Sequence, residues 1–285
     1  MSALTLQQAL RQATQQLTHL SDAEPRFDAE VLLCHLLQKN PSHLIAWPDK
    51  VLNDAQKQAY TTLINRRATG EPVAYITGQR EFWSLELQVT PATLIPRPET
   101  EILVEQALVH IPKEAQWQIA DLGTGSGAIA LAIASERPHC QLYAIDMSAE
   151  ALAVAKQNAK RLNIHNINFL HSHWLDAFST KSLNMVLSNP PYIETSDPHL
   201  CQGDVRFEPA SALSSGVDGL DDIRILIASA AQTLLPNGWL MMEHGYNQAK
   251  VVMDLLRQQG YCNVEDYADY AGNDRVAAGQ QSGQL

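Results

Sequence analysis

The stretch Ile119-Ala120-Asp121-Leu122-Gly123-Thr124-Gly125-Ser126-Gly127-Ala128-Ile129-Ala130 has the pattern of a strand, a glycine-rich turn and the start of a helix. Glycines in such a turn let a ligand approach the backbone, and a helix N-terminus offers free N–H groups to an anion. The spacing G-x-G-x-G differs from the dinucleotide fingerprint G-x-G-x-x-G, and no Gly-Lys-Ser/Thr follows as in a P-loop. The turn is therefore a candidate ligand loop. The alternative is a plain tight turn that needs only glycine's backbone freedom.

Short apolar strands alternate with helices on the carboxyl side of Trp117. This alternation predicts an α/β fold with a doubly wound, mostly parallel sheet. A last pair of strands without a helix between them predicts an antiparallel edge hairpin. The predicted strands are 118–121, 141–145, 167–170, 184–188 and 239–243, the predicted helices are 128–136, 149–162, 220–234 and 248–259, and the edge pair is 262–267 with 274–279.

The chain before this sheet has a helical pattern. Apolar residues repeat at helical spacing over 4–17 and 29–37, and a third helix is predicted from Asp54 to Ala68. Residues 41–48 are predicted to be a loop. Further predictions are a hairpin or extended bridge over 73–94, a helix over 101–109, and core or interdomain packing for Trp47, Trp83 and Trp117. We expect a small all-helical, substrate-docking domain over 1–72, a hairpin linker over 73–95 with the junction near residue 90, and the α/β domain over 96–285.

Composition narrows the class of protein. The 285 residues include 20 Lys plus Arg against 31 Asp plus Glu, a net charge of −11. A free-standing nucleic-acid binder normally carries a basic footprint, so the charge suits a basic protein partner better. Four cysteines without a Cys-x-x-Cys pair indicate reduced thiols, and no secretory leader pattern or membrane-spanning apolar run is visible. We therefore expect a cytoplasmic protein.

Asp146 ends the strand that follows the glycine loop, 21 positions after Gly125. In doubly wound folds, an acidic residue at this place hydrogen-bonds the ribose hydroxyls of a bound nucleoside. The alternative is a helix N-cap, supplied by Asp146 or by Ser148. Together with the glycine loop, the spacing favours the ribose role and a ligand that contains a nucleoside.

The predicted strand 184–188 runs directly into Asn189-Pro190-Pro191-Tyr192. A residue before proline is kept extended, and a proline nitrogen cannot donate, so the carbonyls before the ring nitrogens stay available. The side-chain oxygen of Asn189 and the carbonyl of Pro190 can accept the two protons of a planar amide or amine nitrogen. Holding both protons aims the nitrogen at an electrophile, and the ring of Tyr192 offers a π face to the developing charge. The motif therefore predicts methyl transfer to a planar nitrogen, with Asn189, Pro190 and Tyr192 as candidate catalytic residues.

These residues resemble the class I methyltransferases that use S-adenosyl-L-methionine, and more narrowly the HemK/PrmC family of peptide-chain release factor glutamine methyltransferases. The resemblance extends over nearly the whole length and includes Ile95-Pro96-Arg97-Pro98-Glu99-Thr100-Glu101 and Gly203-Asp204-Val205-Arg206-Phe207-Glu208-Pro209. It implies methylation of the glutamine amide nitrogen in the Gly-Gly-Gln loop of release factors. We also expect a monomer, and the charge, the short apolar runs and the lack of a ligand set predict that it binds no nucleic acid, membrane or metal. The implied cofactor residues are Gly123, Thr124, Gly125, Ser126, Gly127, Asp146, Trp174 and Asn189, and the implied substrate residues are Asn189, Pro190, Pro191 and Tyr192.

One position departs from the family pattern, which often has an acidic residue immediately before the tryptophan. This chain has His173 there, so a backbone carbonyl or Asp176 is expected to recognise the adenine amino group instead. His171, His173 and His244 are expected to be structural or solvated, because a metal would need more ligands. The acidic residues 197–222 are expected to form a solvated loop and helix start, with reception of a basic substrate loop as the alternative.

Three other functions stay open from the residues alone. They are methylation of a ribosomal-protein glutamine, methylation of adenine N6 in nucleic acid, and a catalytically inactive cofactor-binding module. The acidic charge disfavours DNA, the 97–100 stretch resembles the release-factor branch, and the intact Asn189 to Tyr192 motif argues against an inactive module.

Overall fold

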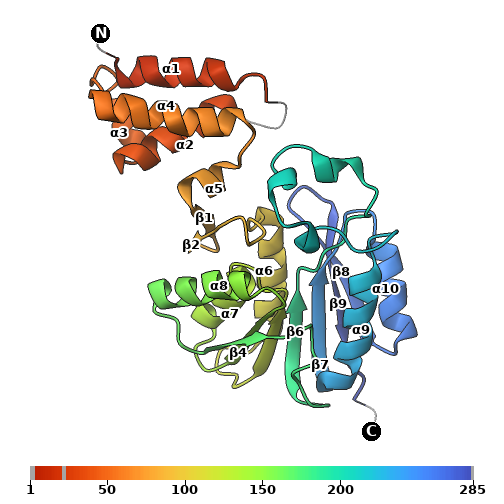
Figure 1. The fold of residues 1–285 in the computed structure, drawn as a ribbon. Helices are drawn as coiled ribbons and strands as arrows, with labels where there is room; N and C mark the ends of the chain where they lie inside the picture. Colours follow the sequence, from red (N-terminus) through yellow and green to blue (C-terminus); the bar gives the residue numbers. More distant parts are fainter. Residues whose placement is uncertain (1–3, 21–23, 284–285) are drawn as a thin grey trace. The chain divides into compact units, whose positions relative to one another are not determined.

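The computed structural model describes residues 4–20 and 24–283 (Figure 1). Its contacts divide the chain into two compact units. The first comprises Met1–Gln79 and Pro198–Phe207, and the second comprises Arg80–Asp197 and Glu208–Leu285. No helix within the described residues is both long and apolar enough to cross a membrane.

The first unit is helical, as predicted. Leu6, Ala9, Leu10, Ala13 and Leu17 form the buried stripe of the first helix. The Thr5 hydroxyl and the Gln8 side chain satisfy each other's backbone N–H groups in a capping box at its start. The helices are α1 Leu6–Leu17, α2 Pro25–Leu37, α3 Pro41–Ala46, α4 Asp54–Ala68 and α5 Val73–Thr77.

Helix α3 shows that the loop predicted over 41–48 is wrong for residues 41–46. The side chain of Asn40 accepts a hydrogen bond from the backbone N–H of His43 at 3.1 Å, and Pro41 occupies the first turn. Asn-Pro therefore starts a helix here, because an N-cap side chain and a proline at the first helical position both favour initiation. The prediction of core packing for Trp47 is also wrong, since this residue is 61% exposed, whereas Trp83 and Trp117 pack against the core of the second unit.

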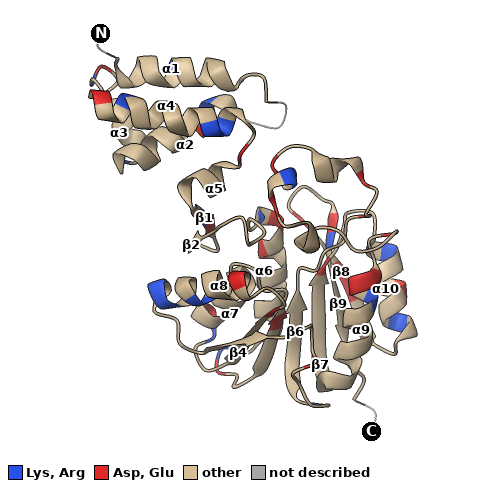
Figure 2. Ribbon diagram, in the orientation of Figure 1, with Lys and Arg blue, Asp and Glu red and all other residues tan. Residues whose placement is uncertain are grey.

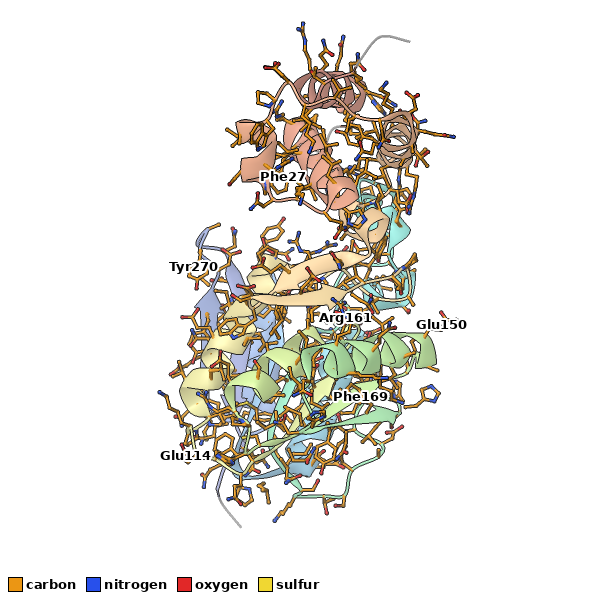
Figure 3. The ribbon with its side chains drawn as sticks, turned by 90° about the vertical axis from the view of Figure 1, so that its left-hand side faces the viewer. Phe27, Glu114, Glu150, Arg161, Phe169 and Tyr270 are labelled. Atoms are coloured by element: carbon orange, nitrogen blue, oxygen red, sulfur yellow. The ribbon has the colours of Figure 1, made fainter. Side chains whose placement is uncertain are left out.

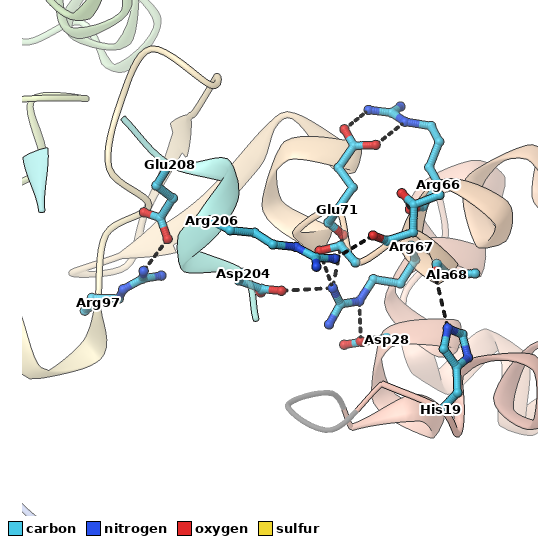
Figure 4. Close-up of polar contacts among 12 residues, drawn as sticks. His19, Asp28, Arg66, Arg67, Ala68, Glu71, Arg97, Asp204, Arg206 and Glu208 are labelled. Carbon is cyan, nitrogen blue, oxygen red and sulfur yellow. Dashed lines mark hydrogen bonds and ion pairs between the residues drawn. The ribbon is translucent and has the colours of Figure 1, made fainter. Parts of the chain in front are cut away.

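Arg67 of α4 is the main buried cation of the helical unit (Figure 4). It is 4% exposed and donates to the carboxylates of Asp28 at 2.7 Å and Asp204 at 2.9 Å. Asp204 belongs to the returning segment Pro198–Phe207, which also holds the 3₁₀ helices η2 Pro198–Cys201 and η3 Val205–Phe207. The helical unit is therefore assembled from two separate pieces of the sequence.

The second unit is a seven-stranded sheet in the order β5-β4-β3-β6-β7-β9-β8. The five strands β5, β4, β3, β6 and β7 pair in parallel, and β9 pairs antiparallel with both β7 and β8. The predicted α/β fold with an antiparallel edge is therefore confirmed. The strands are β3 Gln118–Leu122, β4 Gln141–Asp146, β5 Ile167–His171, β6 Leu183–Ser188, β7 Leu234–Glu243, β8 Cys262–Ala268 and β9 Asp274–Gln280.

Two apolar layers cover the sheet. Successive strand residues such as Ile119 and Ala120 point to opposite faces of the sheet and belong to different apolar clusters, because side chains alternate along a strand. One cluster packs under α6 Glu101–His110, α7 Ala128–Glu136 and α8 Ala149–Leu162, and the other under α9 Asp221–Thr233 and α10 Ala249–Gln258. The central strands β6 and β7 carry almost no charge along their length (Figure 2), as expected for strands buried on both faces.

A two-stranded hairpin, β1 Gln79–Phe82 and β2 Leu85–Gln88, packs on α8 (Figure 3). The fully buried side chain of Asn158 fixes it there. Its amide accepts from the Gln88 N–H at 2.7 Å and donates to the Gln88 and Ser126 carbonyls, both at 2.9 Å. One side chain therefore connects the hairpin to the glycine loop. Two further 3₁₀ helices in this unit are η1 Pro98–Thr100 and η4 Ala210–Ala212.

Candidate active site

A cavity of about 470 Å³ lies at the carboxyl edge of the parallel strands. This is the edge where open α/β sheets bind ligands, and the volume is in the range of small-molecule sites. Residues from the loops after β3, β4, β5 and β6 line it together with residues 91–94 and part of 209–222. The predicted site residues among them are Gly123, Gly125, Asp146, Trp174, Asn189 and Pro191.

The glycine loop needs its glycines for backbone conformation. Gly123, Gly125 and Gly127 have φ values of +68°, +55° and +86°, which L side chains rarely adopt. Gly127 also caps α7, so this helix starts at the loop. Thr124 and Ser126 are buried and face the protein instead of the cavity.

The buried side chain of Asp121 stabilises this loop through hydrogen bonds. Its Oδ2 accepts from the hydroxyl of Thr124 at 2.6 Å and from the N–H of Ala130 at 3.1 Å. Burial raises the pKa of Asp121 to about 7, against the lowering effect of these two hydrogen bonds. The carboxyl group therefore connects the end of β3 to the first turn of α7.

Asp146 lines the cavity, while Ser148 caps the next helix. The hydroxyl of Ser148 accepts from the N–H of Ala151 at 3.1 Å, which is the N-cap bond of α8. The carboxylate of Asp146 accepts from Gly125 N–H at 2.9 Å and Ser148 N–H at 2.8 Å. Asp146 therefore orders the loop around the cavity and presents its carboxylate at the cavity wall.

Trp174 forms a further wall. Its ring lies against Gly123, where a Cβ would meet it at 3.5 Å, and its backbone has a positive φ of +41°. The neighbouring His173 also lines the cavity and lies 3.8 Å from the Asp176 carboxylate, and both side chains are more than half exposed. Asp176 itself is not among the lining residues.

The Asn189 to Tyr192 motif leaves the end of β6 with its residues in different environments. Asn189 and Pro191 line the cavity, whereas Pro190 is buried and Tyr192 packs against the core. The hydroxyl of Tyr192 donates to Glu243 Oε1 at 3.0 Å. Burial, followed by the charge of Glu243, raises the pKa of Tyr192, so this residue stays neutral.

Sequence reasoning missed two contacts that shape this site. Glu208 has a fully buried carboxylate that pairs with Arg97 and accepts from the Ile95 N–H at 2.9 Å. Thr100 donates to Glu243 Oε2 at 2.6 Å and accepts from Asn189 Nδ2 at 3.1 Å. Arg97, Thr100 and Glu208 lie in the two stretches that resemble the family, and Glu243 ends an apolar strand, but neither signal shows which of these residues meet.

The acidic residues 197–222 do not form one uniformly solvated loop. Glu208 is buried, Asp204 pairs with Arg67, and both Asp218 and Asp221 pair with the exposed Arg224. Asp222 lines the cavity and accepts from the Ser215 hydroxyl at 2.7 Å. Most of these carboxylates are therefore committed to partners within the protein.

The histidines have ordinary partners. The buried His244 lies 2.6 Å from the Asp266 carboxylate and 2.9 Å from the Gly245 carbonyl, and His171 lies 2.8 Å from the Met147 carbonyl. No group of three potential metal ligands occurs within 4–20 and 24–283.

The seven-stranded sheet and the glycine loop beside an Asn-Pro-Pro-Tyr motif define a class I methyltransferase. Two family models match, the PrmC N-terminal domain over residues 8–78 and the methyltransferase small domain over residues 99–206. A release factor glutamine methyltransferase of Vibrio cholerae is 51% identical over 282 residues, which cover 98% of this chain and 97% of that one. Its Escherichia coli counterpart is 47% identical over 271 residues, which cover 95% and 97%. The chain belongs to the release factor glutamine methyltransferase family.

A solved structure agrees with the fold. A methyltransferase of Pyrococcus furiosus superposes with a TM-score of 0.54 and 15% identity, over 78% of this chain and 99% of its own. At this identity the likeness supports the architecture alone.

Proposed function

We propose that this enzyme transfers a methyl group from S-adenosyl-L-methionine to the side-chain amide nitrogen of the glutamine in the Gly-Gly-Gln loop of peptide-chain release factors. The observation that carries the proposal is the position of Asn189 on the wall of the same cavity as Gly123, Gly125 and Asp146. Membership of the release factor glutamine methyltransferase family supports the choice of substrate.

The residues around the cavity fit the cofactor. Positive φ values at Gly123 and Gly125 keep side chains away from the backbone, and the N-terminus of α7 is adjacent. The carboxylate of Asp146 suits a ribose diol, and the ring of Trp174 suits the adenine. We propose that Asn189, which lines the cavity, touches both cofactor and substrate. When bound, S-adenosyl-L-methionine supplies an electrophilic methyl group on a positively charged sulfur.

The chain's own residues account for the reactivity of an amide nitrogen. Its lone pair is delocalised into the carbonyl, so orientation matters more than removal of a proton. We propose that Asn189 Oδ1 and the Pro190 carbonyl accept its two N–H groups, which fixes the nitrogen and favours the positive charge that develops there. Pro191 forms the rigid cavity wall beside it. No strong base is required, because the product nitrogen loses its proton after transfer.

The ring of Tyr192 is held in place by contacts on the protein side. Its hydroxyl is bound to Glu243, and it packs among the residues behind the cavity wall. We propose that its ring supports the adjoining prolines and offers its face to the substrate when a glutamine enters.

The helical unit is proposed to dock the protein substrate. It exposes Phe27, Ile45 and Trp47, which are 61%, 78% and 61% exposed (Phe27 is labelled in Figure 3). Exposed aromatic and aliphatic side chains are typical anchors for protein partners. We further propose that the enzyme acts as a monomer in the cytoplasm, where release factors work, and contacts neither nucleic acid nor membrane.

The test is direct. The enzyme is incubated with labelled cofactor and, separately, with a release factor, a ribosomal protein and adenine-containing DNA. Peptide mass spectrometry should find one methyl group on the Gly-Gly-Gln glutamine. Label on the ribosomal protein or DNA, with none on the release factor, would overturn the proposal in favour of that substrate.

A further inference from the structure

Four side chains from three segments form one hydrogen-bonded chain behind the cavity wall. Asn189 Nδ2 donates to Thr100 Oγ1 at 3.1 Å, and Thr100 Oγ1 donates to Glu243 Oε2 at 2.6 Å. The hydroxyl of Tyr192 donates to the other carboxylate oxygen, Oε1, at 3.0 Å. Glu243 therefore connects the first and last residues of the Asn-Pro-Pro-Tyr motif.

The fold brings these residues together through strand register. Ser188 of β6 pairs with Met242 of β7, so the chain reaches Asn189 and Glu243 at the same edge of the sheet. Thr100 ends η1, and its hydroxyl makes no capping bond to α6. Thr100 and Glu243 are 4% and 1% exposed, so water does not compete freely for these bonds.

The number of protons sets the direction of the chain. A threonine hydroxyl has one proton, and a carboxylate only accepts. Thr100 gives its proton to Glu243, so its remaining lone pairs can only accept. The Asn189 group that faces Thr100 must then be the NH₂ group.

The orientation of the Asn189 amide matters for the substrate. If Nδ2 is held by Thr100, Oδ1 is the atom left for a ligand, and Oδ1 makes no hydrogen bond to the described part of the chain. In the opposite orientation, the NH₂ group of Asn189 would face the NH₂ group of the substrate and could not accept a hydrogen bond from it.

Opposing effects act on the carboxyl group of Glu243. The pKa of Glu243 is raised overall, mainly by burial and also by the charge of Glu99, against the lowering effect of the hydroxyls of Thr100 and Tyr192 and of the charge of Arg275. The acceptor role of Glu243 is therefore supported by geometry, because each of its two oxygens faces one hydroxyl donor, Thr100 at Oε2 and Tyr192 at Oε1.

We propose that Thr100 and Glu243 are positioning residues that fix the amide of Asn189 with its oxygen toward the cavity. In this way they determine that the site accepts a hydrogen bond from the substrate nitrogen. The inference rests on the proposed function of Asn189 and identifies what orients that residue.

The first test compares T100V with T100S in the full-length enzyme. Valine matches threonine in shape but removes the hydroxyl, so kcat should fall by about 10- to 100-fold, the range expected for a misplaced reacting group. Serine keeps the hydroxyl and should recover most of kcat. Cofactor affinity should stay within about threefold in both variants, because they alter orientation instead of the cofactor pocket.

T233V is the matched control. Thr233 is also buried, at 4% exposure, and its hydroxyl donates to the Ser229 carbonyl at 2.6 Å within α9, away from the cavity. It should lose stability as T100V does and keep its kcat. A wild-type kcat in T100V, or an equal loss in T100V and T233V, would overturn the positioning role.

A second measurement does not depend on activity. In protein labelled with ¹⁵N at asparagine, the Asn189 side-chain NH₂ signal, assigned by its loss in N189A, should shift in T100V and in E243Q. It should return toward the wild-type position in T100S. An unchanged signal in T100V would overturn the inference even if the wild-type enzyme proved to methylate another substrate. A wild-type enzyme that leaves release factors unmodified would count against the proposed function alone.

Discussion

The carboxylate of Glu208 is completely buried and pairs with the guanidinium of Arg97, 111 positions earlier in the chain (Figure 4). The same carboxylate accepts from the backbone of Ile95 at 2.9 Å. Both neighbouring stretches contribute to the cavity wall, through Leu94 on one side and Pro209 on the other. This ion pair therefore holds together two loops that line the cavity.

Removing one partner should be costly. R97A leaves the Glu208 carboxylate buried without its cation, so the free energy of unfolding should fall by about 3 kcal/mol. Urea denaturation measures this. R257A is the control, because the Arg257–Asp254 pair is about half exposed and its loss should change stability by less than about 0.5 kcal/mol. Similar values for the two variants would show that Arg97 does not stabilise the loops.

The ribose role of Asp146 can be separated from helix capping. D146A should weaken binding of S-adenosyl-L-methionine by about 1–3 kcal/mol, through lost hydrogen bonds to a charged group. S148A removes the N-cap bond of α8 and should cost about 1 kcal/mol of stability with little change in cofactor affinity. Titration calorimetry measures the affinities. An unchanged affinity in D146A would remove Asp146 from the ribose site.

The buried Asp121 predicts a dependence of stability on pH. Its pKa rises on folding from 3.8 to about 7. Below about pH 4 the group is neutral in both states, and between about pH 4 and 7 only the unfolded chain ionises, so stability falls as pH rises and levels off above 7. D121N keeps an oxygen that can accept from Thr124 and Ala130. Between pH 4 and 7, the free energy of unfolding of D121N, measured by urea denaturation, should therefore increase relative to that of the wild type. Parallel curves would contradict the raised pKa.

Asn189 should affect turnover more than cofactor binding. N189A removes the proposed acceptor for the substrate amide, and kcat should fall by about 100-fold or more, as for loss of a transition-state contact. Cofactor affinity should stay closer to normal. Single-turnover kinetics with a release factor and calorimetry with the cofactor measure the two effects. A normal kcat would exclude the proposed amide clamp.

The exposed apolar residues of α3 and its C-cap test the docking role of the helical unit. The double variant I45S/W47S should raise KM for a release factor by about 10-fold, as loss of interface anchors does, with cofactor affinity unchanged. V109S is the control, since Val109 of α6 is 73% exposed but lies in the other unit. If KM is unchanged in both variants, the substrate does not dock on Ile45 and Trp47.

Local signals made much of the fold predictable. Helices α4, α7 and α8 begin and end at the predicted residues. Their starts are marked by residues that favour the N-cap position, which are Asn53, Gly127 and Ser148. The alternation of short apolar strands with helices predicted the parallel sheet. Helix α3 was missed because Asn40-Pro41 can end one helix or start another, and local sequence does not distinguish the two.

Contacts between distant positions could not be predicted. Thr100 and Glu243 are 143 positions apart, and each has an ordinary local role as a helix-start residue or strand end. Their pairing depends on the register of β6 and β7, which sets the residues that meet at the sheet edge. For Asp146, Trp174 and Asn189, the sequence identified residues that line one cavity, but it did not reveal what orients Asn189 behind the cavity wall.

The returning segment Pro198–Phe207 has a consequence for how the protein is made. Ribosomes release a chain from its N-terminus, and early domains usually fold first. Here Arg67 receives its second carboxylate from Asp204, which is synthesised 137 residues later. Until most of the parallel sheet has been translated, the buried guanidinium of the nascent helical unit therefore has Asp28 but lacks the carboxylate of Asp204. A gene fragment that stops at Gln79 would encode a unit that lacks its final piece.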